Sequence, residues 1–254
     1  MFNDELEFEK ALVNLLFTSC GWDKNVIKNP TEEDLINNWA NILFENNKER
    51  DVLNNCPLTE NEMHQILTQV NTLKTPLKLN GFINGKTVSI TRDNPDDQLH
   101  FNKKVSLKIY DRMEIAGGKS RYQIVEQPRF KTDNSVYPTR RGDVMLLING
   151  MPVIHIELKK SGVAVSQATT QIEKYMHNNV FTGIFSLIQI FVAMSPEESL
   201  YFANPGYNGK FNSDFYFHWE DFNNNIINDW RDFTTRVLSI PMAHEMVGFY
   251  TIAD

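Results

Sequence analysis

Arg140 to Tyr175 has the sequence RRGDVMLLINGMPVIHIELKKSGVAVSQATTQIEKY, and this stretch decides the fold. Two apolar runs in it flank Asn149-Gly150, a dipeptide that favours a tight β-hairpin turn. Asp143 opens the first run, and Glu157 and Lys159 lie near the end of the second. Burying a carboxylate and an ammonium in an apolar strand is costly unless they are paired or bind something. The hairpin is therefore the first place to look for a functional site.

The length of the hairpin loop decides whether the two carboxylates meet. A strict two-residue loop pairs Ile148 with Met151 and sends Asp143 and Glu157 to opposite faces of the sheet. A three-residue loop pairs Ile148 with Pro152 and brings the two carboxylates into register, with Cβ atoms about 4.5–5.5 Å apart. A shared site therefore requires an odd loop or a bulge. Pro152 cannot donate to a strand ladder, which favours an irregular corner.

The spacing of apolar residues changes from strand-like to helical after Ser161-Gly162 and predicts a helix over residues 165–176. Gln171 and Tyr175 are four residues apart and are therefore neighbours on its surface. Similar spacing predicts helices over residues 4–19, 34–46, 59–70 and 221–238. Strands are predicted over residues 87–92, 105–110, 122–127, 187–194 and 200–203. We expect a turn region over residues 76–85, a polar loop over 131–138, and a tail or linker over 240–254.

The composition is that of an ordinary globular chain of 254 residues with a net charge of −7. No apolar run is long enough to span a membrane, and the start of the chain does not resemble a signal peptide. Cys20 and Cys56 form no disulfide framework or zinc motif, so we expect a cytoplasmic protein. Residues 103–141 carry ten basic and four acidic side chains and lead directly into Asp143. A phosphate backbone could approach there, although a solvated set of strands is an equally good interpretation.

The sequence Gly117-Gly118-Lys119-Ser120 is superficially similar to the end of a nucleotide-binding P-loop. That motif needs a further glycine five residues before its Gly-Lys-Ser glycine, where this chain has Met113. We therefore predict no nucleotide-binding site and no organic cofactor.

Asp143, Glu157 and Lys159 together suit the hydrolysis of phosphodiesters. Two carboxylates, with the backbone carbonyl of Leu158 as a third candidate donor, are hard oxygen ligands of the kind that Mg²⁺ prefers. A bound Mg²⁺ can polarise a phosphoryl oxygen and acidify a water, and a lysine can offset negative charge building on the phosphate. A surface salt bridge is the simple structural alternative, because Glu-x-Lys is a common tripeptide. Here it occurs once, on the most apolar hairpin of the chain.

These motifs also resemble a known family. Asp-x13-Glu-Leu-Lys followed by Gln-x3-Tyr is similar to the N-terminal nuclease domain of the R (restriction) subunit of type I restriction–modification enzymes, which belongs to the PD-(D/E)xK nucleases. The resemblance extends to residues 7–12, 21–22, 123–127, 189–192 and 201–204. It implies an α/β restriction-endonuclease-like fold, with a central mixed β-sheet flanked by helices. It also implies a nuclease domain over residues 1–238, with residues 239–254 as a linker towards an absent ATP-dependent motor.

The resemblance assigns roles to individual residues. Asp143 and Glu157, with the Leu158 carbonyl, would hold Mg²⁺, and Lys159 would be the catalytic lysine. Gln171 and Tyr175 would brace the site or contact the DNA backbone, although a helix with a polar edge packing on the sheet would look the same.

Two further side chains near the predicted site have less certain roles. The first-helix carboxylate of the family would be Glu9, but Glu5 lies one turn earlier on the same helix face and could serve instead. We expect His155 to be a satisfied neighbour of the site and not a metal ligand.

The implied activity is Mg²⁺-dependent endonucleolytic cleavage of double-stranded DNA. The implied partners are DNA, the motor and helicase domains of the same subunit, and the methyltransferase (M) and specificity (S) subunits. ATP would act only through the motor. Two alternatives stay open: a repair nuclease of the same fold, and a DNA-binding or assembly module with a degenerate site. Residues 177–186 either face the motor or form an ordinary surface loop. The acidic net charge fits a domain delivered to DNA by its partners, so we expect weak or no cleavage by this chain alone.

Overall fold

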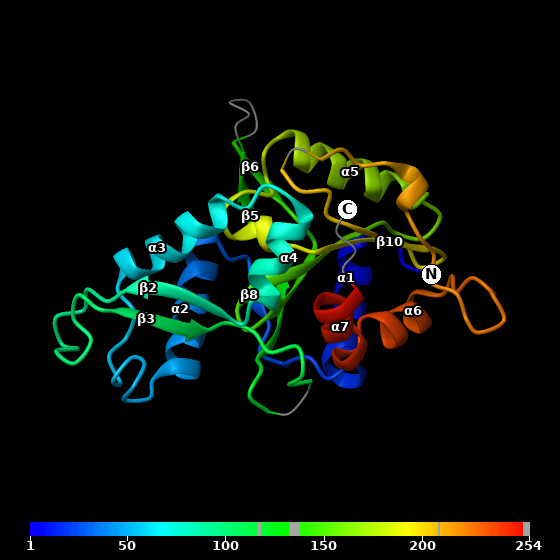
Figure 1. Ribbon diagram of the computed structural model, residues 1–254. Helices are drawn as coiled ribbons and strands as arrows, with labels where there is room; N and C mark the ends of the chain where they lie inside the picture. Colours follow the sequence, from blue (N-terminus) through cyan, green and yellow to red (C-terminus); the bar gives the residue numbers. More distant parts are fainter. Residues whose placement is uncertain (116–117, 133–137, 208, 251–254) are drawn as a thin grey trace.

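The computed structural model describes residues 1–115, 118–132, 138–207 and 209–250. A six-stranded sheet forms its centre (Figure 1), in the order β1-β4-β7-β8-β9-β10. The pairs β1–β4 and β8–β9 are parallel and the others antiparallel, so the sheet is mixed. The predicted α/β fold with a central mixed sheet is therefore confirmed. The strands are β1 (Ile27–Lys28), β4 (Tyr122–Glu126), β7 (Val144–Ile148), β8 (Met151–Leu158), β9 (Ile190–Met194) and β10 (Ser199–Ala203).

The hairpin of β7 and β8 combines a two-residue turn with a bulge. Asn149 and Gly150 have φ angles of 51° and 82°, the positive values that a tight hairpin turn of this kind requires. Ile148 pairs with Met151, so the loop has two residues and not an odd number. The register then shifts, because Leu147 faces Pro152 while Leu146 faces Ile154. Val153 is the surplus residue of a β-bulge, which was the other route expected from the sequence.

The bulge determines which face of the sheet each side chain of β8 after Val153 points to. Val144 pairs with Ile156, so the next step of the ladder sets Asp143 opposite Glu157. If the same residues paired without a bulge, Asp143 would instead lie opposite Ile156, which is buried in the core.

Helices cover both faces of the sheet (Figure 1). Helix α5 (Ser166–His177) packs on β8 and β9, and α1 (Glu5–Ser19) lies on the other side against α6 (Trp230–Val237). Capping boxes begin α2 (Glu32–Asn47) at Thr31 and α3 (Glu60–Asn71) at Thr59, because each threonine and the acidic residue three positions later satisfy each other's backbone N–H. The four helices predicted over residues 4–19, 34–46, 59–70 and 165–176 are confirmed.

Two small antiparallel pairs lie outside the main sheet. Strands β2 (Thr87–Thr91) and β3 (Lys104–Lys108) pair where strands were predicted. Strands β5 (Arg129–Lys131) and β6 (Thr139–Arg141) form a short hairpin around the predicted polar loop, of which residues 133–137 lie outside the described residues.

Three stretches differ from the predictions. Residues 76–84 form α4 (Pro76–Asn84) and not a turn, since Pro76 occupies the first helical turn, where proline is tolerated. Of residues 221–238, only α6 is helical; it begins after Asp229, whose side chain caps it. Residues 183–187 form a 3₁₀ turn, η1 (Gly183–Leu187), before β9 begins at Ile190.

The C-terminal segment is also more ordered than expected. Residues 240–250 form α7 (Ile240–Glu245) and a π-helical turn, η3 (Met246–Tyr250). Ile240, Ala243 and Val247 are buried in the same core as the sheet, so this stretch packs as part of the domain and is not a free tail. Residues 251–254 lie outside the described residues. No helix in the described part of the chain is both long and apolar enough to cross a bilayer.

Candidate active site

Asp143 and Glu157 meet where β7 begins and β8 ends. The backbone carbonyl of Asp143 accepts the Gln127 N–H at 2.7 Å, and its Oδ2 accepts the Leu158 N–H at 2.7 Å. Glu157 is fully buried, and its carboxyl group hydrogen-bonds that of Asp143. Leu158 thus reaches the site through its N–H. A metal contact from its carbonyl stays a prediction.

The environment of the two carboxyl groups favours their protonated forms. Burial raises the pKa of Glu157 to about 8, while the Lys159 charge acts in the opposite direction. Burial and then the neighbouring Glu157 raise the pKa of Asp143 well above its ordinary value. With no cation between them, the pair therefore retains a shared proton at neutral pH.

Lys159 joins the pair through Gln171. Its Nζ donates to Oε1 of Gln171 at 2.9 Å, and the Gln171 amide donates to Oε2 of Glu157 at 2.7 Å. The same amide donates to the Tyr175 hydroxyl at 2.7 Å, and that hydroxyl donates to the Arg141 carbonyl at 2.8 Å. Of the two roles expected for Gln171 and Tyr175, these contacts correspond to bracing.

His155 packs against the site, and only one of its two ring nitrogens has a hydrogen-bond partner among the described residues. Its Nε2 is 2.9 Å from Oε1 of Glu157, whereas no hydrogen-bond partner for Nδ1 is found among the described residues. Burial lowers the pKa of His155 to about 4, so the ring is neutral and a single hydrogen joins Nε2 to the Glu157 carboxyl group. The ring also presses on the backbone before Asp143, since a Cβ on Gly142 would lie 2.6 Å from its Cε1 atom. The predicted neighbour is thus hydrogen-bonded through Nε2, and its exclusion as a metal ligand stays a prediction.

The two carboxylates of α1 reach different parts of the site. Glu9 is buried and accepts the Gln127 amide at 3.0 Å; burial, followed by the charge of Asp143, raises its pKa to about 7. Glu5 is half-exposed and pairs with the Lys159 ammonium at 3.1 Å. Glu9 therefore lies close to the carboxyl group of Asp143, whereas Glu5 pairs with Lys159.

A groove of about 1260 Å³ opens above these side chains. The polar edge of α5 and the β5–β6 hairpin both contribute to its lining. Its charged lining residues are five basic and one acidic: Arg129, Arg140, Arg141, Lys159, Lys174 and Glu5. In a chain of net charge −7, this is a local reversal of sign. The basic run before Asp143 signalled part of it, but Lys174 gave no signal in the sequence.

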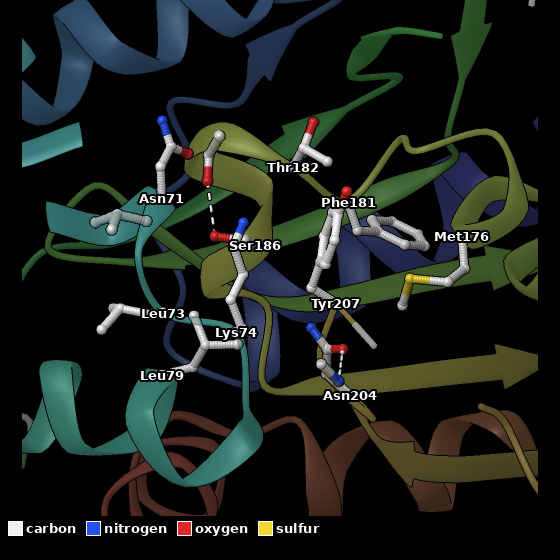
Figure 2. Close-up of a pocket in the computed structure, with 13 residues that line it drawn as sticks. Asn71, Leu73, Lys74, Leu79, Met176, Phe181, Thr182, Ser186, Asn204 and Tyr207 are labelled. Carbon is white, nitrogen blue, oxygen red and sulfur yellow. Dashed lines mark hydrogen bonds between the residues drawn. The ribbon is translucent and has the colours of Figure 1, made fainter. Parts of the chain in front are cut away.

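A second cavity lies under the segment 176–186 (Figure 2), between the end of α3 and the turn η1. Its volume of about 40 Å³ accommodates only a few water molecules. Lys74 lies over the ring of Tyr207 at its rim, 4.2 Å from the ring centre. Phe181 and Phe185 are buried in the core, so residues 177–186 are not an ordinary surface loop. Whether they face a motor domain stays a prediction.

Lys119 and Ser120 of the Gly-Lys-Ser sequence hydrogen-bond a nearby carboxylate of the same chain. The Lys119 N–H donates to one oxygen of Glu114 at 2.8 Å, and the Ser120 hydroxyl donates to the other at 2.5 Å. A carboxylate thus occupies the donors that a phosphate would need. Gly117 lies outside the described residues.

Comparison with known proteins gives concordant matches. A family model described as type I restriction enzyme R protein N terminus matches residues 3–210. The type I restriction enzyme SsaAORF53P endonuclease subunit of Staphylococcus saprophyticus is 30% identical over 258 residues, covering 100% of this chain and 25% of that protein. The SauMSSORF170P endonuclease subunit of Staphylococcus aureus is 27% identical over 257 residues with the same coverages. The EcoprrI endonuclease subunit of Escherichia coli is 33% identical over 151 residues, 59% of this chain and 46% of that protein. The chain thus spans about a quarter of the length of the first two relatives.

Proposed function

Because this chain belongs to the type I restriction enzyme R protein N-terminus family, we propose that it is the nuclease part of such a subunit and hydrolyses phosphodiester bonds of double-stranded DNA with Mg²⁺. This proposal includes membership of the PD-(D/E)xK nucleases. The observation that carries it is the convergence of Asp143, Glu157 and Lys159 on one hydrogen-bonded network. A surface salt bridge does not explain that convergence, because Glu157 and Lys159 are both buried.

The donor set fits a hard divalent cation. Among the described residues, no group of three or more His, Cys, Asp or Glu side chains is arranged to hold a metal ion. Mg²⁺ needs fewer protein ligands than that, since it usually binds one or two carboxylates and keeps several waters. Asp143 and Glu157 would hold the ion, because their like charges lie buried at hydrogen-bonding distance and a cation could replace their shared proton. Glu9 lies near enough to Asp143 for its charge to be felt there and is the next candidate.

The remaining chemistry comes from the side chains themselves. Bound Mg²⁺ would supply Lewis-acid polarisation of the phosphate and an acidified water. The Lys159 ammonium would offset negative charge on the phosphate in the transition state. Gln171 would fix the ammonium and Glu157 relative to each other, since it contacts both. To reach DNA, Lys159 would exchange its contact with Glu5, which is the half-exposed partner of the two.

Delivery to DNA would depend on the remainder of the enzyme. The chain is acidic overall and spans about a quarter of its relatives, so we propose that the motor of the same subunit and the methyltransferase and specificity subunits bring it to the substrate. ATP use would belong to that motor. The linker towards the motor would begin after the helices of residues 240–250.

The test is cleavage of DNA by the assembled enzyme carrying Glu157→Ala or Lys159→Ala. We expect both to abolish cleavage while the chain stays folded and DNA translocation continues. Lys160→Ala and Glu197→Ala are matched controls, since both residues are exposed and lie outside the network. Cleavage that persisted in both site variants would refute the proposed roles.

A further inference from the structure

The β5–β6 hairpin carries two arginines directly opposite each other. In its register Arg129 pairs with Arg141, and the neighbouring residue Phe130 is buried in the core on the other face of the hairpin. Both arginines are exposed, and both line the groove above Lys159. The hairpin and α5 lie at the same end of the molecule (Figure 1) and form two walls of this groove.

This pairing is unfavourable for the folded chain alone. Directly opposed residues of an antiparallel pair have Cβ atoms about 4.5–5.5 Å apart, and like charges at such positions are destabilising. None of the ion pairs found among the described residues includes Arg129 or Arg141. The charges of Arg129 and Arg141 act only at longer range on the carboxyl groups of Asp34 and Glu9, which offset part of the repulsion. Local arrangements that oppose stability are expected at functional sites, where a ligand compensates for them.

Resting on the proposed function, we infer that Arg129 and Arg141 form a phosphate-binding pair that holds the backbone of double-stranded DNA beside the cleavage site. Guanidinium groups suit this ligand because their planar N–H forks bind phosphate oxygens bidentately. The Tyr175 hydroxyl, bonded to the Arg141 carbonyl at 2.8 Å, ties the hairpin to α5 and hence to Gln171. The pair is thereby held at a set position relative to Lys159. Lys174 of α5 and Asn178, the residue that follows α5, line the opposite wall, where the second strand would run.

The structure predicts two effects of opposite sign for a single substitution. Arg129→Gln or Arg141→Gln removes the like-charge contact, so the melting temperature should rise by roughly 1–3 °C. The same change should weaken binding of a short fluorescent duplex roughly tenfold at low salt. It should also reduce the slope of log affinity against log salt by about 0.9, the value for one lost phosphate contact. Binding is measured by fluorescence anisotropy in EDTA, so that nothing is cleaved.

Controls separate this pair from general electrostatics. Arg129→Lys keeps the charge but loses the bidentate fork, so it should keep the salt slope and recover only part of the affinity that Arg129→Gln loses. Lys104→Gln on β3 removes an exposed charge away from the groove and should change neither readout. Unchanged affinity and salt slope in both arginine variants would overturn the inference, as would undetectable binding by the parent chain at low salt or equal losses in the Lys104 control. If Glu157→Ala still abolished cleavage by the assembled enzyme, the proposed function would stand while this inference fell.

Discussion

Nε2 of His155 hydrogen-bonds Oε1 of Glu157 at 2.9 Å, while Gln171 donates to Oε2 of the same carboxyl group at 2.7 Å. Each carboxyl oxygen of Glu157 is thus held by a hydrogen bond to a different side chain. Groups that orient metal-binding carboxylates in this way usually matter for affinity almost as much as the ligands do. His155 would then be a positioning residue, although the sequence suggested only a neighbour.

Replacing His155 tests this role. His155→Leu removes the hydrogen bond to Oε1 of Glu157. The affinity for Mn²⁺ or Mg²⁺, measured by calorimetry, should therefore fall roughly 10- to 100-fold. His155→Gln keeps an N–H donor and should lose much less. Equal affinities in the two variants, with both folded, would show that the hydrogen bond to Glu157 does not position the ligand.

The shared proton of Asp143 and Glu157 predicts a pH dependence of stability. The pKa of Glu157 is about 8 in the folded chain and 4.5 ordinarily, so the folded state binds more protons than the unfolded state between these values. The cation-free protein should therefore lose stability from Glu157 as the pH rises from about 4.5 to 8. His155 acts oppositely: its contribution is present above pH 6.5 and is lost as the pH falls towards about 4.

Asp143→Asn isolates the contribution of the two carboxyl groups to the pH dependence of stability. An asparagine can accept the Leu158 N–H and donate to Glu157, which copies the protonated aspartic acid. It should stabilise the cation-free chain at pH 8 by on the order of 2 kcal/mol and much less at pH 5, as measured by urea unfolding. Mg²⁺ should stabilise the parent and not the variant. A larger gain at pH 5 than at pH 8 would contradict the proton-sharing interpretation.

Gly142 is predicted to be intolerant of any side chain. A Cβ there would lie 2.6 Å from Cε1 of His155 and 2.9 Å from Cε2 of Phe130, both ring atoms in the core. Gly142→Ala should destabilise the chain by about 1–3 kcal/mol, as overpacking does. It should also weaken cation binding, because the following residue is Asp143. The double variant Gly142→Ala with His155→Ala should recover part of the lost stability in thermal melts. Additive losses would mean that the two residues do not contact each other.

The C-terminal helices should be required for folding. The Ile240 N–H donates to the Cys20 carbonyl at 2.9 Å, and the Tyr122 hydroxyl lies 2.9 Å from Nδ1 of the buried His244. A chain ending at Leu238 would lose both hydrogen bonds and the burial of Ile240, Ala243 and Val247, so its unfolding free energy should fall by more than about 4 kcal/mol. Removing residues 251–254 alone is the control. Equal melting temperatures for both truncations would make 238 an acceptable boundary for the domain.

Local signals made the hairpin and its neighbouring helix predictable. The two-residue period of β7 and β8, the helical spacing after Gly162 and the capping residues Thr31 and Thr59 all depend on near neighbours in the sequence. The loop keeps two residues because Asn149-Gly150 suffices for the turn. The required irregularity is the bulge at Val153, directly after Pro152, the residue whose missing N–H favours an irregular corner.

Other features depend on contacts that a sequence does not display. The burial of Glu9 against Gln127 and the basic groove formed by α5 with the β5–β6 hairpin arise only when distant segments meet. Pro76 was interpreted as a turn residue although it is equally suited to the first turn of a helix. The π-helical turn of residues 246–250 has no regular period to detect, which is why the end of the chain was expected to be unstructured.

The surplus Val153 gives loss and gain of one residue in this hairpin opposite consequences. Deleting Val153 would leave a regular two-residue hairpin in which Leu146 still pairs with Ile154, so Glu157 would stay opposite Asp143. Inserting one residue between Gly150 and His155 would instead turn the histidine and the glutamate over and present Ile154 and Ile156 in their place. A homologue whose hairpin is one residue shorter would therefore be expected to keep both acidic residues and to lack the bulge.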